Sequence, residues 1–217
     1  KKIIVKVHNV RDFCTDKHHT VDDSPYGGGA GMVQKVDVWF RALKAIVGSK
    51  EINLRLNSKK RKIGNWKLEI GNSRSRPQTR IVLLDPAGKQ FTHSLAQHYA
   101  KKYTRIVFLC GRYEGFDARI HHVIDERISV GPYVLSGGEL PALTILETTA
   151  RLLPGVLGNA ASLTSETSAA SPDFPVYTRP ATFSPKKGVA WKVPPVLLSG
   201  HAKNIETWRR KQQKPRP

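Results

Sequence analysis

Two kinds of apolar pattern alternate along the chain, short continuous apolar runs and longer stretches with helical spacing. Residues 80–84 (RIVLL) and 105–110 (RIVFLC) are nearly continuous apolar runs. Runs of this kind are typical of strands that are buried on both faces of a parallel sheet. The pattern therefore predicts an α/β fold with a mostly parallel sheet, and residues 3–7 (IIVKV) are expected to form a further strand.

Helices are predicted between and around these runs. Apolar residues recur on one face of residues 33–47, as a helix requires: Val36, Phe40, Leu43 and Val47. Residues 92–102 fit a helix between the two strands. Residues 139–153 (ELPALTILETTARLL) fit another, with Pro141 in the first turn, where the missing N–H costs little.

Three stretches interrupt this rhythm. Residues 8–32 form a long polar, glycine-rich loop, and residues 158–175 have the Ser, Thr, Ala and Pro composition of an interdomain linker. Residues 57–78 are a basic insertion, with seven Lys or Arg and one Glu among residues 57–76. The insertion is either a solvated loop or an RNA-contacting segment. The expected organisation is a large first domain at 1–157, the linker at 158–175 and a further domain at 176–217.

Net charge points to a polyanionic partner. The 217 residues include 36 Lys or Arg against 17 Asp or Glu, giving a net charge of +19 and a sequence pI near 10.2. Nucleic acid is the commonest such partner, and a solubility bias or a basic tail is the alternative explanation. No apolar run is long enough to span a membrane, and Cys14 and Cys110 form no CxxC pair. We expect a cytoplasmic protein without disulfides.

Four glycine clusters are candidate ligand loops: YGGGAGM (26–32), DPAGK (85–89), CGRYEGFD (110–117) and VGPYVLSGGELP (130–141). Three of them follow strand-like runs. Loops that leave one edge of a parallel sheet bind ligands in α/β proteins, and glycine lets a ligand approach the backbone. None matches a P-loop or a G-x-G-x-x-G motif. The clusters predict either a cofactor site held by backbone groups or a set of tight turns.

Longer motifs carry a resemblance to a known family. They are RDFCTDKHHTVDDSPYGGGAGM (11–32), CGRYEGFDARI (110–120), ISVGPYVLSGGELPALTILETTARLLPGVLG (128–158), FPVYTRP (174–180) and VPPVLLSGHAKNIETWRRK (193–211). With these motifs the sequence resembles the bacterial tRNA (guanine-N1)-methyltransferase family, TrmD, of the SPOUT class. The matches are long, occur in order and cover most of residues 10–211 apart from the insertion.

The resemblance implies a SPOUT fold with a deep C-terminal trefoil knot in which S-adenosylmethionine binds. It implies a homodimer with shared active sites, which methylates N1 of the guanine 3′ of the tRNA anticodon (position 37) with the help of Mg²⁺. Relatives begin about one strand and one helix earlier. They also continue into a helical tRNA-binding domain, so we expect residues 176–217 to be a truncated part of that domain.

Site residues follow from the same resemblance. The matching cofactor-binding residues are Leu84, Pro86, Gly88, Gly111, Tyr113, Glu114, Gly115, Val130, Gly131, Pro132, Tyr133, Val134, Leu135, Gly137, Gly138 and Pro141. The matching RNA-binding residues are Gly31, Arg112, Ser162 and Arg179. Pro132 stands where the family usually has aspartate, and it removes one backbone N–H from a loop expected to bind adenine through its backbone.

Chemistry at guanine N1 requires a base and a stabiliser. N1 carries a proton that must leave before its lone pair can attack, and negative charge develops on O6. The resemblance assigns the base to Glu166, where the family has an aspartate, and the contact with O6 to Arg151. Asp173 is the alternative base. Glu114 faces the methylsulfonium, holds Mg²⁺, or forms a salt bridge to Arg112 or Arg119.

Two other functions are compatible with the sequence. One is a catalytically dead RNA-binding module that keeps the fold and the charge, and the other is a SPOUT methyltransferase that acts on ribosomal RNA. Asp22 and Asp23 resemble a metal pair, but two hard ligands are too few, and we interpret them as caps of backbone N–H groups in a loop.

Overall fold

A computed structural model describes residues 3–57, 79–157 and 174–213. The chain divides into two compact units, Lys1–Gly158 and Asn159–Pro217, and each unit is described by itself. Residues 57–78 of the predicted insertion fall, apart from Asn57, outside the described residues, as does most of the predicted linker. None of the described helices is long and apolar enough to cross a membrane.

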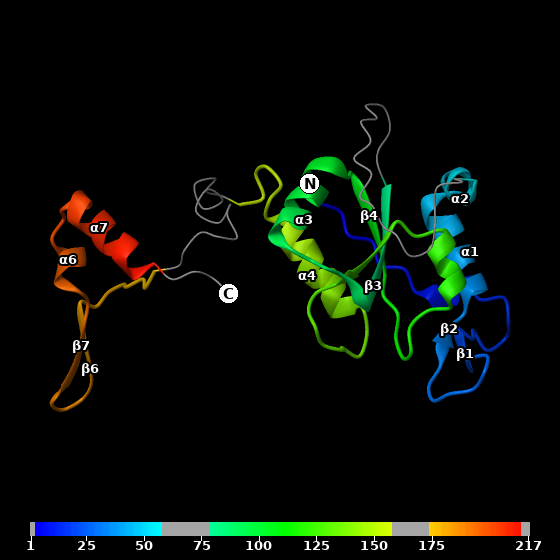
Figure 1. The fold of residues 1–217 in the computed structure, drawn as a ribbon, viewed down its shortest axis with the longest axis horizontal. Helices are drawn as coiled ribbons and strands as arrows, with labels where there is room; N and C mark the ends of the chain where they lie inside the picture. Colours follow the sequence, from blue (N-terminus) through cyan, green and yellow to red (C-terminus); the bar gives the residue numbers. More distant parts are fainter. Residues whose placement is uncertain (1–2, 58–78, 158–173, 214–217) are drawn as a thin grey trace. The chain divides into compact units, whose positions relative to one another are not determined.

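A three-stranded parallel sheet organises the first unit (Figure 1). Strand β3 (Thr79–Gln90) lies at its centre, between β4 (Arg105–Leu109) and β5 (Glu126–Ser129). Along β3 and β4 the register runs from Thr79 opposite Arg105 to Leu83 opposite Leu109. The parallel sheet predicted from the two apolar runs is therefore confirmed.

One face of the sheet is covered by two helices that precede β3 in sequence and by a 3₁₀-helix that follows β4. Ile81 and Leu83 of β3 pack in one cluster of buried side chains with α1 (Val36–Val47), α2 (Ser49–Leu56) and the 3₁₀-helix η2 (Ala118–His122). The opposite face carries a second cluster.

Val82 and Leu84, which alternate with the first pair, pack against α3 (His93–Lys102) and α4 (Glu139–Ala150). The helices lie on the two sides of the sheet in Figure 1. Because successive residues of β3 enter different clusters, both faces of the strand are buried, and this explains its unbroken apolar run.

Helix α1 is formed by the residues that the helical spacing selects. The four predicted apolar positions all pack against the first cluster: Val36, Phe40, Leu43 and Val47. The helix begins at Val36 and not at residue 33, because β2 (Val33–Gln34) pairs antiparallel with β1 (Asp22–Asp23). Strand pairing thus takes the first residues of the predicted helix.

The strand predicted over residues 3–7 is wrong. These residues form no strand in the structure, and the side chains of Ile4, Val5 and Val7 are exposed. A strand needs a neighbour to pair with, and residues 3–7 pair with none of the described strands. The chain next forms the short 3₁₀-helix η1 (Val10–Phe13).

A buried ion pair ties α2 to the sheet. The Arg55 Nη2 atom lies 3.1 Å from the Asp125 Oδ2 atom and also donates to the Thr79 carbonyl, at 3.0 Å. Asp125 Oδ2 in turn accepts a hydrogen bond from the Ile81 amide, at 2.7 Å. Arg55 therefore joins the end of α2 to the beginning of β3.

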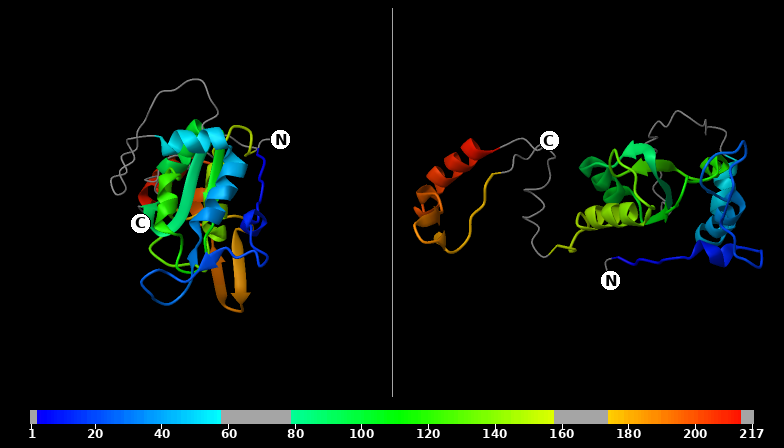
Figure 2. Two further views of the ribbon diagram at one scale, coloured as in Figure 1. Left: turned by 90° about the vertical axis from the view of Figure 1, so that its right-hand side faces the viewer. Right: turned by 90° about the horizontal axis from the view of Figure 1, so that it is seen from below.

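The described part of the second unit, residues 174–213, contains a hairpin and two helices (Figure 2). The hairpin consists of β6 (Thr182–Lys186) and β7 (Val189–Lys192), and the helices are α6 (Pro195–Leu198) and α7 (Ala202–Gln212). None of the side chains described in residues 174–213 is buried. This part of the chain has no apolar core of its own.

Candidate active site

Strand β3 is interrupted within the glycine cluster 85–89, which is called the first glycine loop from here on. Leu84 and Lys89 both lie opposite Ile128 of β5, so the four residues 85–88 leave the sheet and the strand then resumes. At the return, a Cβ atom on Gly88 would lie 2.6 Å from the Ile128 amide nitrogen. Only glycine lets the excursion close so tightly against β5.

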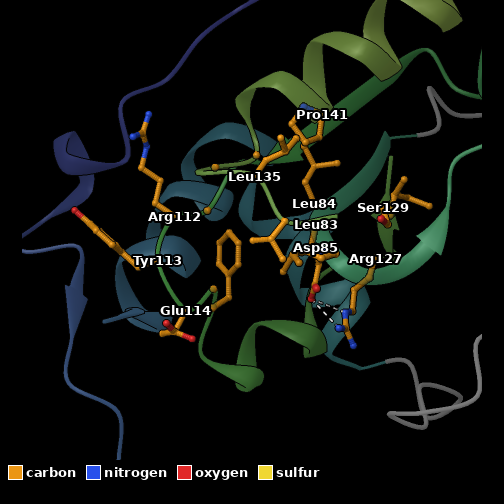
Figure 3. A pocket seen from close by; sticks show the side chains of 18 of the residues that line it. Leu83, Leu84, Asp85, Arg112, Tyr113, Glu114, Arg127, Ser129, Leu135 and Pro141 are labelled. Atoms are coloured by element: carbon orange, nitrogen blue, oxygen red, sulfur yellow. Dashed lines mark hydrogen bonds and ion pairs between the residues drawn. The ribbon is translucent and has the colours of Figure 1, made fainter. Parts of the chain in front are cut away.

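Asp85 holds this excursion in shape. Its Oδ1 atom accepts a hydrogen bond from the Ala87 amide at 2.8 Å, and its Oδ2 atom lies 2.7 Å from Arg127 Nη2 and 2.9 Å from Arg127 Nε. Figure 3 shows the Asp85–Arg127 pair at one side of the cavity. The carboxylate thus links the first glycine loop both to itself and to β5.

The glycine clusters 110–117 and 130–141, the second and third glycine loops, pack against each other. Arg112 and Gly137 form an isolated antiparallel bridge, and the Gly138 amide donates to the Gly111 carbonyl at 3.0 Å. A Cβ atom on Gly138 would lie 2.7 Å from the Cα atom of Cys110. Because the neighbour is backbone and cannot turn aside, the contact between these loops requires glycine at 138.

The glycine-rich segment that contains residues 26–32 packs against the second glycine loop, 110–117. The Glu114 amide donates to the Met32 carbonyl at 3.1 Å, and the Gln34 amide donates to the Gly115 carbonyl at 2.8 Å. Gly31 has a φ of 85°, and a Cβ atom there would lie 2.5 Å from Glu114 Cγ. The predicted RNA-binding residue Gly31 is therefore in contact with a predicted cofactor-binding residue.

A cavity of about 360 Å³ lies where these loops meet, at the carboxyl ends of the strands. This is the edge where ligands bind in open α/β sheets. Most of the predicted cofactor-binding residues line it: Leu84, Pro86, Gly111, Tyr113, Glu114, Gly115, Val130, Tyr133, Val134, Leu135, Gly137, Gly138 and Pro141. In Figure 3, Glu114 and the Asp85–Arg127 pair lie on different sides of it.

Gly88, Gly131 and Pro132 do not line the cavity. Gly88 instead abuts β5, and both backbone groups of Gly131 are engaged by the Ser129 hydroxyl, at 3.2 Å from its nitrogen and 2.8 Å from its oxygen. No hydrogen bond in the described part of the chain occupies the amides of Tyr133, Val134 and Leu135. Those amides are therefore available as donors beside Pro132, which has none.

Several lining residues fall outside the predicted glycine clusters: Leu83, Ala118, His121, Arg127, Ile128 and Ser129. Asp85 and Arg127 are far apart in sequence and meet only through the register of β3 and β5. Burial lowers the pKa of His121, and the positive charge of Arg127 acts in the same direction, so the imidazole is neutral at pH 7.

Cys110 lies next to Gly138, at the contact between the second and third glycine loops. Burial raises the pKa of its thiol to about 11, with a smaller contribution from the charge of Glu139. The thiol is therefore protonated at neutral pH and is neither a nucleophile nor a metal ligand there. Its position next to Gly138 gives it a packing role.

Glu114 forms none of the salt bridges considered for it. Arg112 pairs with Glu139, at 2.9 Å between Nη2 and Oε1, and Arg119 pairs with Asp117. The Glu114 carboxylate thus remains available at the cavity wall. The described residues contain no group of three or more His, Cys, Asp or Glu that could hold a metal ion. Asp23 accepts the Ser24 amide at 2.8 Å, as expected of a loop cap.

Of the two predicted catalytic residues only Arg151 is described, and it does not line the cavity. Arg151 follows α4 as its C-cap and is not among the lining residues. Glu166, Asp173 and the RNA-binding residue Ser162 lie outside the described residues. Arg112 lies on the rim of the cavity in Figure 3, and Arg179 belongs to the second unit.

The cavity presents both apolar walls and polar groups to a small molecule. Leu84, Leu135 and Pro141 give it apolar walls, whereas the amides of residues 133–135 offer hydrogen-bond donors and Glu114 offers a negative charge. Its volume lies in the range of ordinary ligand sites, roughly 300–1,000 Å³. Such a site selects its ligand by shape and backbone contact.

Comparisons with known proteins agree with this geometry. The model of the family described as "tRNA (Guanine-1)-methyltransferase TrmD" matches residues 1–217. Proteins named tRNA (guanine-N(1)-)-methyltransferase are similar over nearly the whole chain. The one from Brevibacillus brevis is 41% identical over 216 residues, which are 98% of this chain and 75% of the relative. The one from Pelotomaculum thermopropionicum is 44% identical over 206 residues, 94% of this chain and 70% of the relative.

Proposed function

The chain belongs to the tRNA (guanine-1)-methyltransferase family, and from this membership we propose that it transfers a methyl group from S-adenosylmethionine to N1 of a guanine in tRNA. The observation that supports this most directly is the cavity. It is lined by three glycine loops that meet at the carboxyl ends of β3, β4 and β5. The finer target, the guanine 3′ of the anticodon, is the one the family resemblance implies.

S-adenosylmethionine fits the donors and walls of this cavity. The amides of Tyr133, Val134 and Leu135 suit the ring nitrogens of adenine, and the carboxylate of Glu114 suits the positive sulfonium. When bound, the cofactor supplies a methyl group already activated by that sulfonium. The residues of the loops contribute orientation, because holding the donor in line with N1 removes much of the entropic barrier.

The remaining chemistry falls to residues around the cavity. We assign to Glu166 the removal of the N1 proton and to Arg151 the stabilisation of the charge on O6, the two roles that the reaction requires. Asp173 is the alternative base. Mg²⁺ finds no ligand set among the described residues, and no step is assigned to it.

A second copy of the chain would complete the site. Leu140 and Leu143 lie three residues apart on α4 and are 63% and 57% exposed, while Val134 in the third loop is 82% exposed. Exposed apolar side chains gathered beside a ligand cavity are characteristic of an interaction surface. We therefore include the homodimer in the proposal, and we add the trefoil knot of SPOUT proteins because the family implies it.

The decisive experiment uses tRNA transcripts that differ only in the nucleotide 3′ of the anticodon. Methyl transfer from labelled S-adenosylmethionine should occur with guanine and fail with adenine at that position. Transfer to ribosomal RNA fragments, with none to tRNA, would favour the ribosomal alternative. Calorimetry with S-adenosylmethionine tests the remaining alternative, because a catalytically dead RNA-binding module has no need to bind the cofactor.

A further inference from the structure

The hairpin β6–β7 presents an aromatic pair to solvent. Phe183 and Trp191 are directly opposite each other in the antiparallel register, and their ring centroids are 5.8 Å apart with an angle of 50° between the planes. The two side chains are 52% and 63% exposed. Two large aromatic side chains on one face of a hairpin usually pack against a core, and here the described residues supply none.

A bulge brings a lysine onto the same face. Between Phe183 and Lys186 the register shifts by one residue, so that Lys186 lies opposite Val189. Val189 is two residues before Trp191 and therefore on the face of Trp191, because side chains alternate along a strand. Pro185, which has no N–H to donate, falls within the shifted segment, where proline is tolerated.

The hairpin and its surroundings are strongly basic. Residues 174–213 carry eight Lys or Arg and one acidic residue, Glu206, which pairs with Arg210 at 3.1 Å. Lys186, Lys187 and Lys192 have no ion pair with a described residue. The charge of the hairpin is therefore not neutralised within the described part of its unit, and it suits a polyanion rather than an apolar protein surface.

We propose that the face formed by Phe183, Trp191 and Lys186 is a stacking platform for an unpaired base of the RNA substrate. Aromatic side chains stack on bases of any sequence, and neighbouring lysines hold the phosphates. The lone hairpin also needs such a partner, because a two-stranded ribbon is at best marginally stable in water. This inference rests on the proposed function, which supplies the RNA.

The test compares Trp191→Ala with Trp191→Phe, using a tRNA transcript and the full chain. The alanine variant should bind tRNA about 5- to 100-fold more weakly, the usual worth of one stacked base, while the phenylalanine variant keeps most of the affinity. Leu198→Ala is the matched control, because Leu198 is 61% exposed in the same unit and lies outside the face. Its affinity for tRNA should not change.

Salt dependence separates stacking from charge. Trp191→Ala should leave the slope of log affinity against log salt unchanged, because it releases no counterions, whereas Lys186→Gln together with Lys187→Gln should lower that slope. Equal tRNA affinity for wild type and Trp191→Ala would overturn the platform. So would a loss of dimer in Trp191→Ala by sedimentation, since the face would then contact protein.

Wild-type binding distinguishes the two failures. If the wild-type chain neither binds nor methylates tRNA, the proposed function has failed, and the platform fails with it. If wild type methylates tRNA and Trp191→Ala does so with unchanged KM, only the platform is wrong. S-adenosylmethionine binding should be equal in all these variants, which also verifies that each one is folded.

Discussion

In the described part of the first unit, 17 Lys or Arg residues are set against 13 Asp or Glu residues, whereas residues 174–213 of the second unit carry eight against one. The first unit buries two apolar clusters and pairs many of its charges, including Arg55 with Asp125 and Arg80 with Glu126. The second buries no described side chain. The buried clusters of the first unit therefore suit a cavity for a small molecule, whereas the excess positive charge of the second unit suits a polyanion.

The residue proposed as the base, Glu166, lies in the sequence between these two described parts of the chain. Glu166→Gln keeps the shape and hydrogen bonding of the side chain but cannot accept the N1 proton. Single-turnover methyl transfer should fall by roughly 10²–10⁴, with cofactor binding and tRNA binding unchanged. This would separate the chemistry from both binding functions.

Its controls are Glu166→Asp, which should retain much of the activity, and Asp173→Asn, which should lose less than Glu166→Gln. If Asp173→Asn abolishes transfer while Glu166→Gln is mild, then Asp173 is the base.

The next largest effect is expected at Gly138. A single methyl in Gly138→Ala would meet the Cα atom of Cys110, so the second and third loops must separate. S-adenosylmethionine should bind roughly 10- to 100-fold more weakly by calorimetry, as overpacking of a close contact predicts. The salt slope of tRNA binding should stay the same. Gly188→Ala is the control in the other unit: Gly188 has a φ of 82°, so the variant strains the β6–β7 turn, but it should leave S-adenosylmethionine binding unchanged.

The sequence predicts those parts of the fold in which one short pattern suffices. The continuous run of residues 80–84 identifies β3, because both of its faces are buried, and the spacing of Val36, Phe40, Leu43 and Val47 identifies the core side of α1. The same reasoning fails for residues 3–7, since a short apolar run does not reveal whether the segment has another strand to pair with. It also overlooks β6–β7, because that hairpin has no buried face to create an alternating pattern.

The candidate site was predictable to the extent that its residues lie in glycine loops. Gly138 and Leu135 are found in this way, and so is Glu114. Asp85 and Arg127 are different, because two opposite charges so far apart meet only once the parallel register of β3 and β5 is known. Arg151 is different again, because its place as the C-cap of α4 does not reveal which ligand it meets.

A loss of tRNA affinity of intermediate size should show which of the two units uses its positive charge to bind RNA. Replacing Lys203, Arg209 and Lys211 by Gln removes three exposed cations from α7, and tRNA affinity should fall about tenfold, with the salt slope lowered by about 2. Replacing the exposed Lys17, Lys50 and Lys101 of the first unit by Gln gives the same net charge. If this second variant loses as much affinity, the contrast between the units does not extend to RNA binding.

A smaller effect is expected from the ion pair that shapes the first glycine loop. Asp85→Ala and Arg127→Ala should each weaken S-adenosylmethionine binding about 2- to 5-fold, because the pair is partly exposed and such pairs contribute little. The double variant should be no worse than either single variant, since both remove the same interaction. Additive losses in affinity would mean that Asp85 and Arg127 act on the cofactor separately.

The smallest expected effect is the change in stability on removing Arg112, an exposed cation of the first unit. Arg112 and Glu139 form an ion pair with side chains 60% and 49% exposed, so losing it should cost less than about 1 kcal/mol of unfolding free energy. Arg112→Ala and Glu139→Gln should therefore unfold at nearly equal denaturant concentrations. Their tRNA affinities should differ, because Arg112→Ala removes a cation at the cavity rim, whereas Glu139→Gln releases that cation from its partner. Weaker binding in the first variant and equal or tighter binding in the second would make Arg112 an RNA contact of the otherwise charge-balanced unit. Equal affinities would restrict RNA recognition to other residues and leave Arg112 a support of the third loop through Glu139.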